Sequence, residues 1–499
     1  MRAETDPGGL YARFDGTPLT FGELDFKSSA FAAYLREQGI GPGDRVAVMM
    51  RNSIRTICVI FGLAKAGIVW VPINAQQRGD GLRYLLSDAR PRLLIHDSDL
   101  RPVIDEATET LELPRLVNDP ERNDGLAEAI AFDGLVGTVS LGPDWPFAIM
   151  YTSGTTGRPK GVVVTHRMLK LASEAAATTT EAGPDDVLFV WEPLYHVGGA
   201  QLLSLPLMRG VVLGMVDRFS ASRFWDQVRR EHATHIHYLG GILQILLKQP
   251  PDGRDRDHGV RIAWGGGCPP NTWRAFQERF GVEIRECYGM TESSSITTVN
   301  IGGPVGSVGR PLPWFDVKIL DEHGRTVAAG ERGEIVVSTD LAGALFPGYF
   351  DNPEATAAVL RGQTLHTGDC GSIDQEGNVF FHGRTTDSVR VRGENVSAYE
   401  VEQVVGTYPD VEDCAIIGVP AEIGEQDIKL FVSPKKGRSI SAALLCDWLQ
   451  QRLPPYQIPR YIAVVDDFER TASHRIVKHR LLSRRDDCWD RFELKDRSA

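Results

Sequence analysis

The sequence lacks the features that mark membrane-spanning, secreted or nucleic-acid-binding proteins. It has no run of roughly eighteen apolar residues, so no membrane span is predicted, and its first residues lack the apolar stretch of a signal peptide. A formal net charge of −12 without a dense basic run argues against a nucleic-acid partner. The seven cysteines form no Cys-x-x-Cys pair and indicate neither a disulfide framework nor a zinc site. From these absences we expect a cytoplasmic protein.

Length and composition are those of an ordinary globular enzyme. A chain of 499 residues is too long for one core, so at least two domains are expected. Hydrophobic residues make up 42% and charged residues 24% of the sequence, which is typical of soluble proteins. The sequence does not set the oligomeric state, and a homo-oligomer is among the states that it allows.

Helix and strand patterns alternate in the first hundred residues. Thr20 is a plausible N-cap with Glu23 three residues further on, which predicts an amphipathic helix towards Leu35. The patterns that follow are a strand at 45–50, a helix at 54–66, a strand at 68–72, a helix at 81–89 and a strand at 93–95. This βαβ alternation predicts an α/β fold in which helices cover a parallel sheet.

The rest of the chain is organised around a polar loop between two apolar runs, each typical of a buried strand. Backbone amides, hydroxyls and a cation of this kind suit a polyphosphate, and glycines allow close approach of the backbone. The candidate ligands are Thr152, Ser153, Gly154, Thr155, Thr156 and Lys160. The spacing is not that of a Walker A loop. A flexible surface hairpin is the alternative interpretation.

The segment 151–161, Tyr-Thr-Ser-Gly-Thr-Thr-Gly-Arg-Pro-Lys-Gly, resembles the phosphate loop of the adenylate-forming superfamily: acyl-CoA synthetases, luciferases and nonribosomal adenylation domains. Further motifs of that superfamily follow in order across nearly the whole chain. The resemblance implies ATP as a substrate, with Mg²⁺ held by Glu292 and Thr156. It also implies a large multi-sheet N-terminal domain with parallel α/β layers and a β-rich subdomain, followed by a small mobile α+β C-terminal domain.

The segment 192–199 places His196 in an apolar turn flanked by glycines. From the residues alone, a packed core histidine and a ligand-binding histidine are equally good interpretations. The segment is similar to a family motif whose histidine lies beside the acyl pocket, where adenylation domains for α-amino acids usually carry an aspartate. This histidine therefore argues against an α-amino-acid substrate. The residues expected to bind the acyl group are His196, Val197, Gly198, Tyr238, Gly240, Trp264 and Gly265.

Three strand patterns end in glycine turns, and ligands of open α/β sheets bind at the carboxyl ends of strands. In the third turn an aromatic ring can stack on a purine, Thr291 can bond a phosphate oxygen and Glu292 can hold Mg²⁺. A simple turn is the alternative, but the turn also matches the family motif Tyr-Gly-x-Thr-Glu. The residues expected to bind nucleotide here are Gly265, Gly266, Gly267, Tyr288, Gly289 and Thr291.

From Gly306 onward the pattern becomes rich in β-strands. Asp369 is expected just before a turn, and the resemblance implies that Asp369 and Arg384 meet the ribose of the nucleotide. The same resemblance predicts an ATP- and acyl-binding domain at 1–384 and a mobile domain at 385–499. Thr386 occupies the position of the pivot, which is commonly Asp or Lys in the family, and Gly393 belongs to a Gly-Glu-Asn segment expected to bind cofactor.

The end of the chain departs from the family pattern. Arg-Thr-x-Ser-Gly-Lys is the usual ending, and its lysine assists adenylation, whereas this chain has His474 and Arg475 in the Gly-Lys positions. Arginine keeps the charge but not the shape of an ammonium group. We expect Arg475 to act in place of the lysine; the alternatives are Lys478 or slow adenylation without either. The catalytic residues expected overall are Arg475, Lys478, His196 and Thr291.

The resemblance implies an ATP-dependent, AMP-forming acid–CoA ligase. A carboxylate attacks the α-phosphorus of ATP to give an acyl-adenylate and pyrophosphate, and the thiol of coenzyme A then takes the acyl group. Segments 389–400 and 488–491 are similar to crotonobetaine/carnitine-CoA ligase-like members, which suggests a small or medium carboxylic acid. The alternatives are a stand-alone adenylation enzyme that loads a carrier protein and a nucleotide-binding homologue with impaired adenylation.

Overall fold

The molecule divides into two units, and the residues of each unit contact mainly other residues of the same unit. The first comprises Met1–Tyr238, Ile242–Asp316 and Val337–Leu365, and the second comprises Leu239–Gly241, Val317–Val336 and His366–Ala499. In this computed structural model the described residues are 2–109, 111–119, 121, 125–134, 139–152, 158–385, 388–391, 394–421, 426–470 and 476–492.

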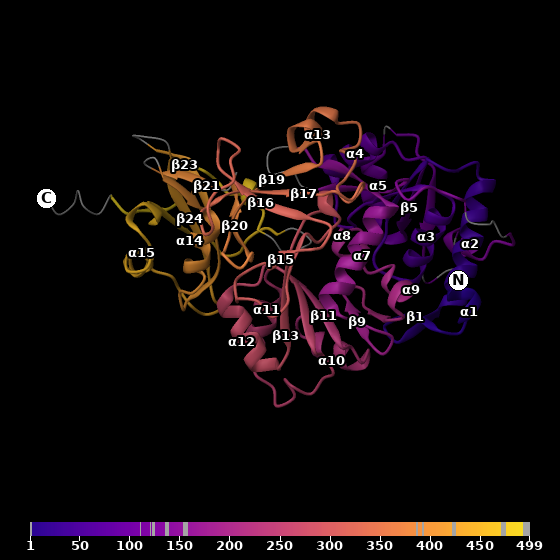
Figure 1. Cartoon of the computed structure of the whole chain (residues 1–499), viewed down its shortest axis with the longest axis horizontal. Coiled ribbons are helices and arrows are strands. Elements are labelled where there is room, and N and C mark those ends of the chain that lie inside the picture. The colour runs from indigo at the N-terminus through magenta and orange to yellow at the C-terminus, as the bar shows by residue number, and fades with distance from the viewer. Residues whose placement is uncertain are drawn as a thin grey trace. The chain divides into compact units, whose positions relative to one another are not determined.

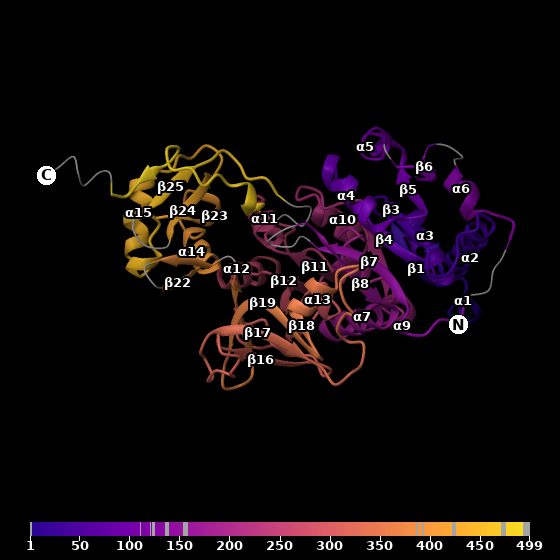
Figure 2. The same ribbon diagram turned by 90° about the horizontal axis from the view of Figure 1, so that it is seen from above.

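A six-stranded sheet in the first unit, with strand order β6-β5-β3-β4-β7-β8, carries the polar loop (Figure 2). Its strands are β3 (Arg45–Met49), β4 (Val69–Pro72), β5 (Leu93–Asp97), β6 (Arg115–Asn118), β7 (Pro146–Thr152) and β8 (Lys160–Thr165). All neighbours are parallel except β7 and β8, which form an antiparallel hairpin. The predicted parallel sheet is therefore confirmed.

Helices cover this sheet as the apolar pattern requires. The helices are α2 (Phe21–Glu37), α3 (Ile54–Lys65), α4 (Gly79–Ala89) and α5 (Arg101–Ala107). Thr20 caps α2 in a complete capping box with Glu23, as the sequence predicts. Leu82 and Leu86 of α4 and Ile104 of α5 pack in one apolar cluster with buried strand residues. Burial of these side chains fixes α4 and α5 on one face of the sheet.

A nine-stranded sheet in the first unit has the order β15-β14-β13-β12-β11-β9-β10-β1-β2 (Figure 1). Its strands are β1 (Leu10–Phe14), β2 (Thr17–Thr20), β9 (Val187–Val190), β10 (Val212–Met215), β11 (His235–Leu239), β12 (Ile262–Gly266), β13 (Glu283–Tyr288), β14 (Thr298–Asn300) and β15 (Arg310–Pro311). Strands β11, β9 and β10 run parallel, as do β12 and β13. Their carboxyl ends therefore form edges at which a ligand can bind.

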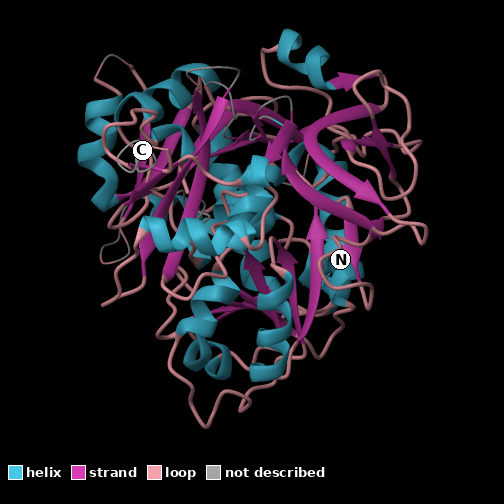
Figure 3. Ribbon diagram, turned by 90° about the vertical axis from the view of Figure 1, so that its left-hand side faces the viewer, coloured by secondary structure: helices cyan, strands magenta, loops and turns pink. Residues whose placement is uncertain are grey.

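Helix α7 (His166–Thr180) contacts strands of both large sheets: β7 and β8 of the first, and β12 of the second. It is largely buried and rich in alanine, including Ala172, Ala175 and Ala176. Small side chains allow a helix to pack closely on both sides. Figure 3 shows helices and strands lying together throughout the chain. The α/β fold class predicted from the sequence is confirmed.

A further sheet has the order β16-β17-β19-β18, with β20 paired to β19. Its strands are β16 (Asp316–Leu320), β17 (Gly333–Ser338), β18 (Leu360–Arg361), β19 (Thr364–Ile373) and β20 (Val379–Arg384). Asp369 lies inside β19, directly opposite Arg384 of β20, and not before a turn as the sequence pattern suggested. The glycines near Asp369 resemble turn residues, but the ladder continues through them with one irregularity between Cys370 and Gly371.

The second unit also contains a four-stranded sheet, β23-β24-β25-β26, and a small hairpin of β21 (Ser388–Val391) and β22 (Glu394–Ser397). The sheet strands are β23 (Val411–Pro420), β24 (Gln426–Pro434), β25 (Tyr461–Val464) and β26 (Trp489–Asp490). Helices α14 (Ala398–Val405) and α15 (Ala442–Gln450) pack in one core cluster with it, and Phe468, Ile476 and Leu481 join another. The predicted α+β character is confirmed. None of the helices in the described ranges has the length and apolarity that crossing a membrane requires.

Candidate functional site

The polar loop joins β7 to β8, and the structure describes both of its ends. Thr152 at the end of β7 pairs with Lys160 at the start of β8. The Tyr84 hydroxyl donates to the Pro159 carbonyl at 3.1 Å, and the Tyr151 hydroxyl donates to Asp88 at 2.5 Å. These bonds hold both ends of the loop to α4. The expected ligands Ser153, Gly154, Thr155 and Thr156 lie outside the described residues.

Tyr349 connects two predicted site residues that are far apart in the sequence. The Lys160 ammonium lies 5.1 Å from the centroid of the Tyr349 ring, a cation–π distance. The Tyr349 hydroxyl donates to Glu292 Oε1 at 2.9 Å, and the Phe346 amide donates to the Glu292 carbonyl at 2.9 Å. Sequence reasoning did not assign Tyr349 to the site, because its contact with Glu292 joins segments 57 residues apart in the sequence.

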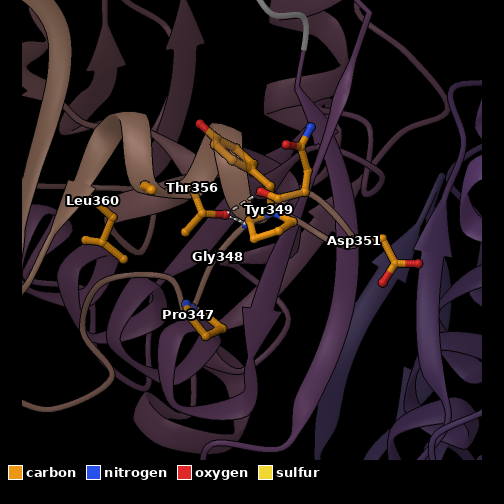
Figure 4. A pocket seen from close by; sticks show the side chains of 9 residues that line it. Pro347, Gly348, Tyr349, Asp351, Thr356 and Leu360 are labelled. Atoms are coloured by element: carbon orange, nitrogen blue, oxygen red, sulfur yellow. Dashed lines mark hydrogen bonds between the residues drawn. The ribbon is translucent and has the colours of Figure 1, made fainter.

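A pocket of about 440 Å³ lies beside Tyr349 and is bounded by α13 (Pro353–Val359) (Figure 4). The Thr356 hydroxyl of α13 accepts a hydrogen bond from the Tyr349 amide at 2.9 Å. Among the described residues, none of those predicted to bind ATP or the acid lines this pocket. The bond from the Tyr349 amide to Thr356 shows that α13 fixes the backbone of Tyr349 beside this pocket.

The glycines at the end of β12 are required by close approach of neighbouring strands. Gly265 has φ +154°, and a Cβ atom on it would lie 1.8 Å from the Tyr238 carbonyl oxygen of β11. A Cβ on Gly266 would lie 2.9 Å from the Cys287 carbonyl oxygen of β13. No side chain fits at Gly265, so the turn that was expected to meet nucleotide and acid is built from backbone alone.

Glu286 of β13 supports this turn from within the protein, and sequence reasoning missed it. Its carboxylate accepts hydrogen bonds from the Gly267 amide at 2.5 Å, the Cys268 amide at 3.1 Å and the Tyr238 hydroxyl at 2.6 Å. Complete burial raises the pKa of Glu286 to about 7 in spite of these bonds. Tyr238, expected to bind the acyl group, is fully buried and directs its hydroxyl to Glu286.

The raised pKa of Glu286 predicts how stability depends on pH. An unfolded glutamate has a pKa of about 4.3, so between that value and about 7 the folded protein binds more protons than the unfolded chain. Stability from this group is therefore complete below about pH 4.3 and is lost as pH rises through 7, by at most about 4 kcal/mol. Melting temperatures of the wild type and Glu286→Gln, measured from pH 5 to 8, should converge at low pH and separate in favour of the variant at high pH.

Glu283→Gln is the matched control for this measurement. Glu283 lies in the same strand, but its side chain is 45% exposed and pairs with Arg285. The Glu283→Gln profile should run parallel to that of the wild type. A Glu286→Gln profile that also runs parallel would contradict a titration of Glu286 near neutral pH.

The motif after β13 forms a tight buried turn. A Cβ on Gly289 would lie 2.1 Å from the Ser295 carbonyl oxygen, so this position also requires glycine. Tyr288, Thr291 and Glu292 are 8%, 7% and 8% exposed. Glu292 Oε1 accepts from Tyr349, while Oε2 has no hydrogen-bond partner in the described part of the chain. Glu292 therefore offers one oxygen to a ligand.

This carboxylate fits Mg²⁺, which is commonly bound by one or two carboxylates together with substrate phosphates. Within the described ranges, no group of three or more His, Cys, Asp or Glu side chains could hold a metal ion by itself. The donor set thus fits a metal that arrives with a nucleotide, held by Glu292 and phosphate oxygens. When bound, Mg²⁺ would neutralise phosphate charge.

The residues expected to bind the acyl group converge after β9 and β11. His196 begins the short helix α8 (Val197–Ala200), and its Nδ1 accepts a hydrogen bond from the Gly198 amide at 3.1 Å. A Cβ on Gly198 would lie 3.3 Å from His196 Nδ1 and 3.8 Å from His237 Cε1. The His237 and Trp264 rings lie 4.3 Å apart between centroids. The structure therefore brings Val197, Gly198, His196 and Trp264 together and adds His237.

In the second unit, Asp369 and Arg384 face each other across β19 and β20. The Arg384 Nε atom lies 2.8 Å from Asp369 Oδ1, and the Asp369 side chain is 3% exposed. The two residues assigned to the ribose are thus joined as an ion pair. Gly240, another predicted residue of this unit, has φ +50° and no atom within 4 Å of a Cβ position, and Gly393 lies outside the described residues.

The loop of Arg475 has a well-defined base. Arg475 itself lies outside the described residues, but Arg470 and Ile476 form an antiparallel bridge on either side of it. The Val477 amide donates to the Glu469 carbonyl at 2.9 Å. Lys478, the alternative cation, lies 2.8 Å from Glu402 Oε1 in an ion pair.

The chain is similar in sequence to known proteins over almost its whole length. The family model described as AMP-binding enzyme matches residues 2–350, and its C-terminal domain model matches residues 400–475. The chain is 31% identical over 494 residues to the crotonobetaine/carnitine–CoA ligase of Escherichia coli O8 (strain IAI1), covering 95% of this chain and 94% of that ligase.

Solved structures give the same result. ATP-bound MatB from Rhodopseudomonas palustris has a TM-score of 0.86 at 28% identity, with 95% of each chain covered. A benzoate CoA ligase from Burkholderia xenovorans LB400 has a TM-score of 0.87 at 26% identity, with 96% of this chain and 97% of that chain covered.

Proposed function

The chain belongs to the AMP-binding enzyme family and is an ATP-dependent, AMP-forming acyl-CoA synthetase, and we propose that its acid is a small or medium carboxylic acid that is not an α-amino acid. The observation that carries the proposal is His196. It stands where an ammonium-binding aspartate is expected for amino acids, and its Nδ1 is bonded to the Gly198 amide. An imidazole in this position supplies no fixed negative charge for an ammonium group.

The phosphate-binding loop and the glycine turn have separate roles in the reaction. Free carboxylates are poor acyl donors, and attack of the acid on the α-phosphorus of ATP gives an acyl-adenylate with AMP as a good leaving group. Lys160 and the loop hydroxyls, Thr156 among them, bind the phosphates, and Glu292 holds the metal that accompanies them. The glycine turn at Gly265–Gly267 positions nucleotide and acid. Catalysis of this kind rests on orientation and charge neutralisation.

Coenzyme A then reacts at the same carbonyl after pyrophosphate has left. A boundary after Arg384, with Thr386 as the pivot, allows residues 385–499 to rotate between the two half-reactions. Thr386 lies outside the described residues. The small domain brings Arg475 to the first reaction and the Gly393 segment to the second. Such a rotation separates two reactants that cannot occupy the site together.

The phosphate role of the loop predicts a selective defect. Lys160→Ala and Thr156→Ala should lower the rate of acyl-adenylate formation about 10- to 100-fold, because charge on the β- and γ-phosphates loses its partners. Transfer from a supplied acyl-adenylate to coenzyme A should change far less, since those phosphates are gone. Pyrophosphate release and thioester formation, measured separately, test this. Equal losses in both half-reactions would argue against phosphate binding.

The function itself is tested with a panel of carboxylic acids. Purified protein is incubated with ATP, Mg²⁺, coenzyme A and each acid, and acyl-CoA products are detected by mass spectrometry. We expect thioesters of small or medium acids and none of α-amino acids. Products found only on the phosphopantetheine of an added carrier protein would overturn coenzyme A as the acceptor. Turnover confined to α-amino acids would overturn the proposed substrate class.

A further inference from the structure

Glu192 and His237 form a buried pair that the reaction described above does not use. Glu192 is fully buried, His237 is 4% exposed, and His237 Nδ1 is hydrogen-bonded to Glu192 Oε1. A buried carboxylate is costly unless it is paired, so Glu192 holds a proton on Nδ1 of the imidazole. Nε2 is then the nitrogen that His237 can offer to another molecule.

The pair lies at the carboxyl ends of adjacent parallel strands. His237 is near the end of β11, Glu192 follows the end of β9, and these strands are neighbours (Figure 1). Asn52 fixes the segment after β9, because its side chain donates to the Glu192 carbonyl at 2.7 Å and accepts from the Leu194 amide at 3.0 Å. The pair is therefore held rigidly at an edge where ligands bind.

The surroundings of His237 are those of the expected acyl site. Its ring packs 4.3 Å from that of Trp264, and its Cε1 lies 3.8 Å from a Cβ position on Gly198. Trp191 Nε1 donates to the His237 carbonyl at 2.9 Å, which fixes the backbone. Across the described ranges, Nε2 has no hydrogen-bond partner of its own. The ring carbon bonded to Nε2 thus lies next to Gly198, so this edge of the imidazole faces the turn expected to meet the acid.

We propose that His237 Nε2, oriented by Glu192, hydrogen-bonds a hydroxyl group on the acyl chain, so that hydroxylated carboxylic acids are preferred over their parent acids. This inference rests on the proposed function and adds to it a substrate class. A hydroxyl both donates and accepts, so it can pair with a neutral or a protonated imidazole. A hydrocarbon chain in the same place leaves Nε2 without a partner, which disfavours the parent acid.

The test compares each short or medium straight-chain acid with its monohydroxylated derivatives, scored as kcat/KM for pyrophosphate release. We expect at least one hydroxy acid to exceed its parent about 10-fold in the wild type, the value of one net hydrogen bond. His237→Leu should bring that ratio close to unity. Glu192→Leu should lower the ratio as well, and the double variant should add little, because Glu192 acts through His237.

His235→Gln is the matched control. His235 is a fully buried histidine two residues earlier in the same strand, and its Nε2 bonds to the Thr180 carbonyl at 3.0 Å. This variant should keep the wild-type ratio. Because the ratio is taken within one protein, partial unfolding lowers both of its terms equally.

Two results would overturn the inference while leaving the synthetase function intact. One is a wild type that uses parent and hydroxy acids equally well. The other is His237→Leu with an unchanged ratio, including the case in which every acid becomes slower by the same factor. If no acid of either kind yields acyl-CoA, the proposed function fails first, and the two failures are thereby distinguished.

Discussion

Arg475→Ala should lower the rate of acyl-adenylate formation about 100-fold or more, the usual scale for loss of a group that stabilises developing charge. Transfer of a supplied acyl-adenylate to coenzyme A should stay within roughly threefold of wild type, because the family's catalytic cation acts only in the first half-reaction. Pyrophosphate release measures the first step, and thioester formation from synthetic acyl-adenylate measures the second.

The ion pair that Lys478 forms argues against this lysine as the working cation. The Lys478 ammonium lies 2.8 Å from Glu402 Oε1, which also accepts the Ile416 amide at 2.7 Å. Moving Lys478 into the active site would break this ion pair in a half-buried setting. The base of the loop is fixed by the bridge between Arg470 and Ile476, and Arg470 also pairs with Asp413 at 2.6 Å.

Lys478→Ala is therefore the matched control, and its adenylation rate should remain within roughly threefold of wild type. Arg475→Lys adds a second comparison, since it restores the family's usual ammonium group. We expect this variant to be active. A silent Arg475→Ala together with a damaging Lys478→Ala would show that the lysine is the working cation and that the loop is offset from the family pattern.

Glu292→Gln should weaken the use of Mg-ATP about 100-fold at limiting Mg²⁺, with a smaller defect at saturating Mg²⁺. Removing the charge takes away a hard anionic oxygen ligand, whereas the amide oxygen keeps the shape of the side chain. The Tyr349 hydroxyl can still donate to that oxygen, so the local fold should persist. Initial adenylation rates across an Mg²⁺ titration give the shift in apparent affinity.

Tyr349→Phe separates the hydrogen bond from the charge of Glu292. It removes the 2.9 Å bond to Oε1 but leaves the ring beneath the Lys160 ammonium and the carboxylate in place. Its Mg²⁺ dependence should lie much nearer to the wild type than that of Glu292→Gln. Wild-type turnover of Glu292→Gln at limiting Mg²⁺ would remove Glu292 from the metal site.

Local signals in the sequence predicted the regular parts of the fold. Thr20 and Glu23 marked the start of α2, and the alternation of apolar runs predicted that β3, β4 and β5 run parallel, because each rule involves neighbours in the chain. Asp369 was misplaced before a turn for the same reason. Its nearby glycines are local turn signals, while its ladder partner Arg384 lies fifteen residues further along the chain.

Contacts between distant segments could not be predicted in this way. Glu286 looks like an ordinary charged residue of a strand, yet it binds the amides of the Gly267 turn and the Tyr238 hydroxyl. Tyr349 likewise reaches Glu292 across the chain. The order of the motifs located the site. The contacts of Glu286 and Tyr349, which hold the site residues in place, depend on how strands and turns come together in space.

The ion pair between Asp369 and Arg384 has a consequence for nucleotide selection. The Asp369 carboxylate is 3% exposed, so the free-energy cost of dehydrating it arises during folding and not during ligand binding. Ribose hydroxyls placed there would meet an acceptor that is already dehydrated and already oriented, which is preorganisation. An acceptor in this condition discriminates strongly against a ligand that lacks the donor. If these residues bind the ribose, the protein distinguishes ATP from its deoxy analogues by an arrangement that is complete before either arrives.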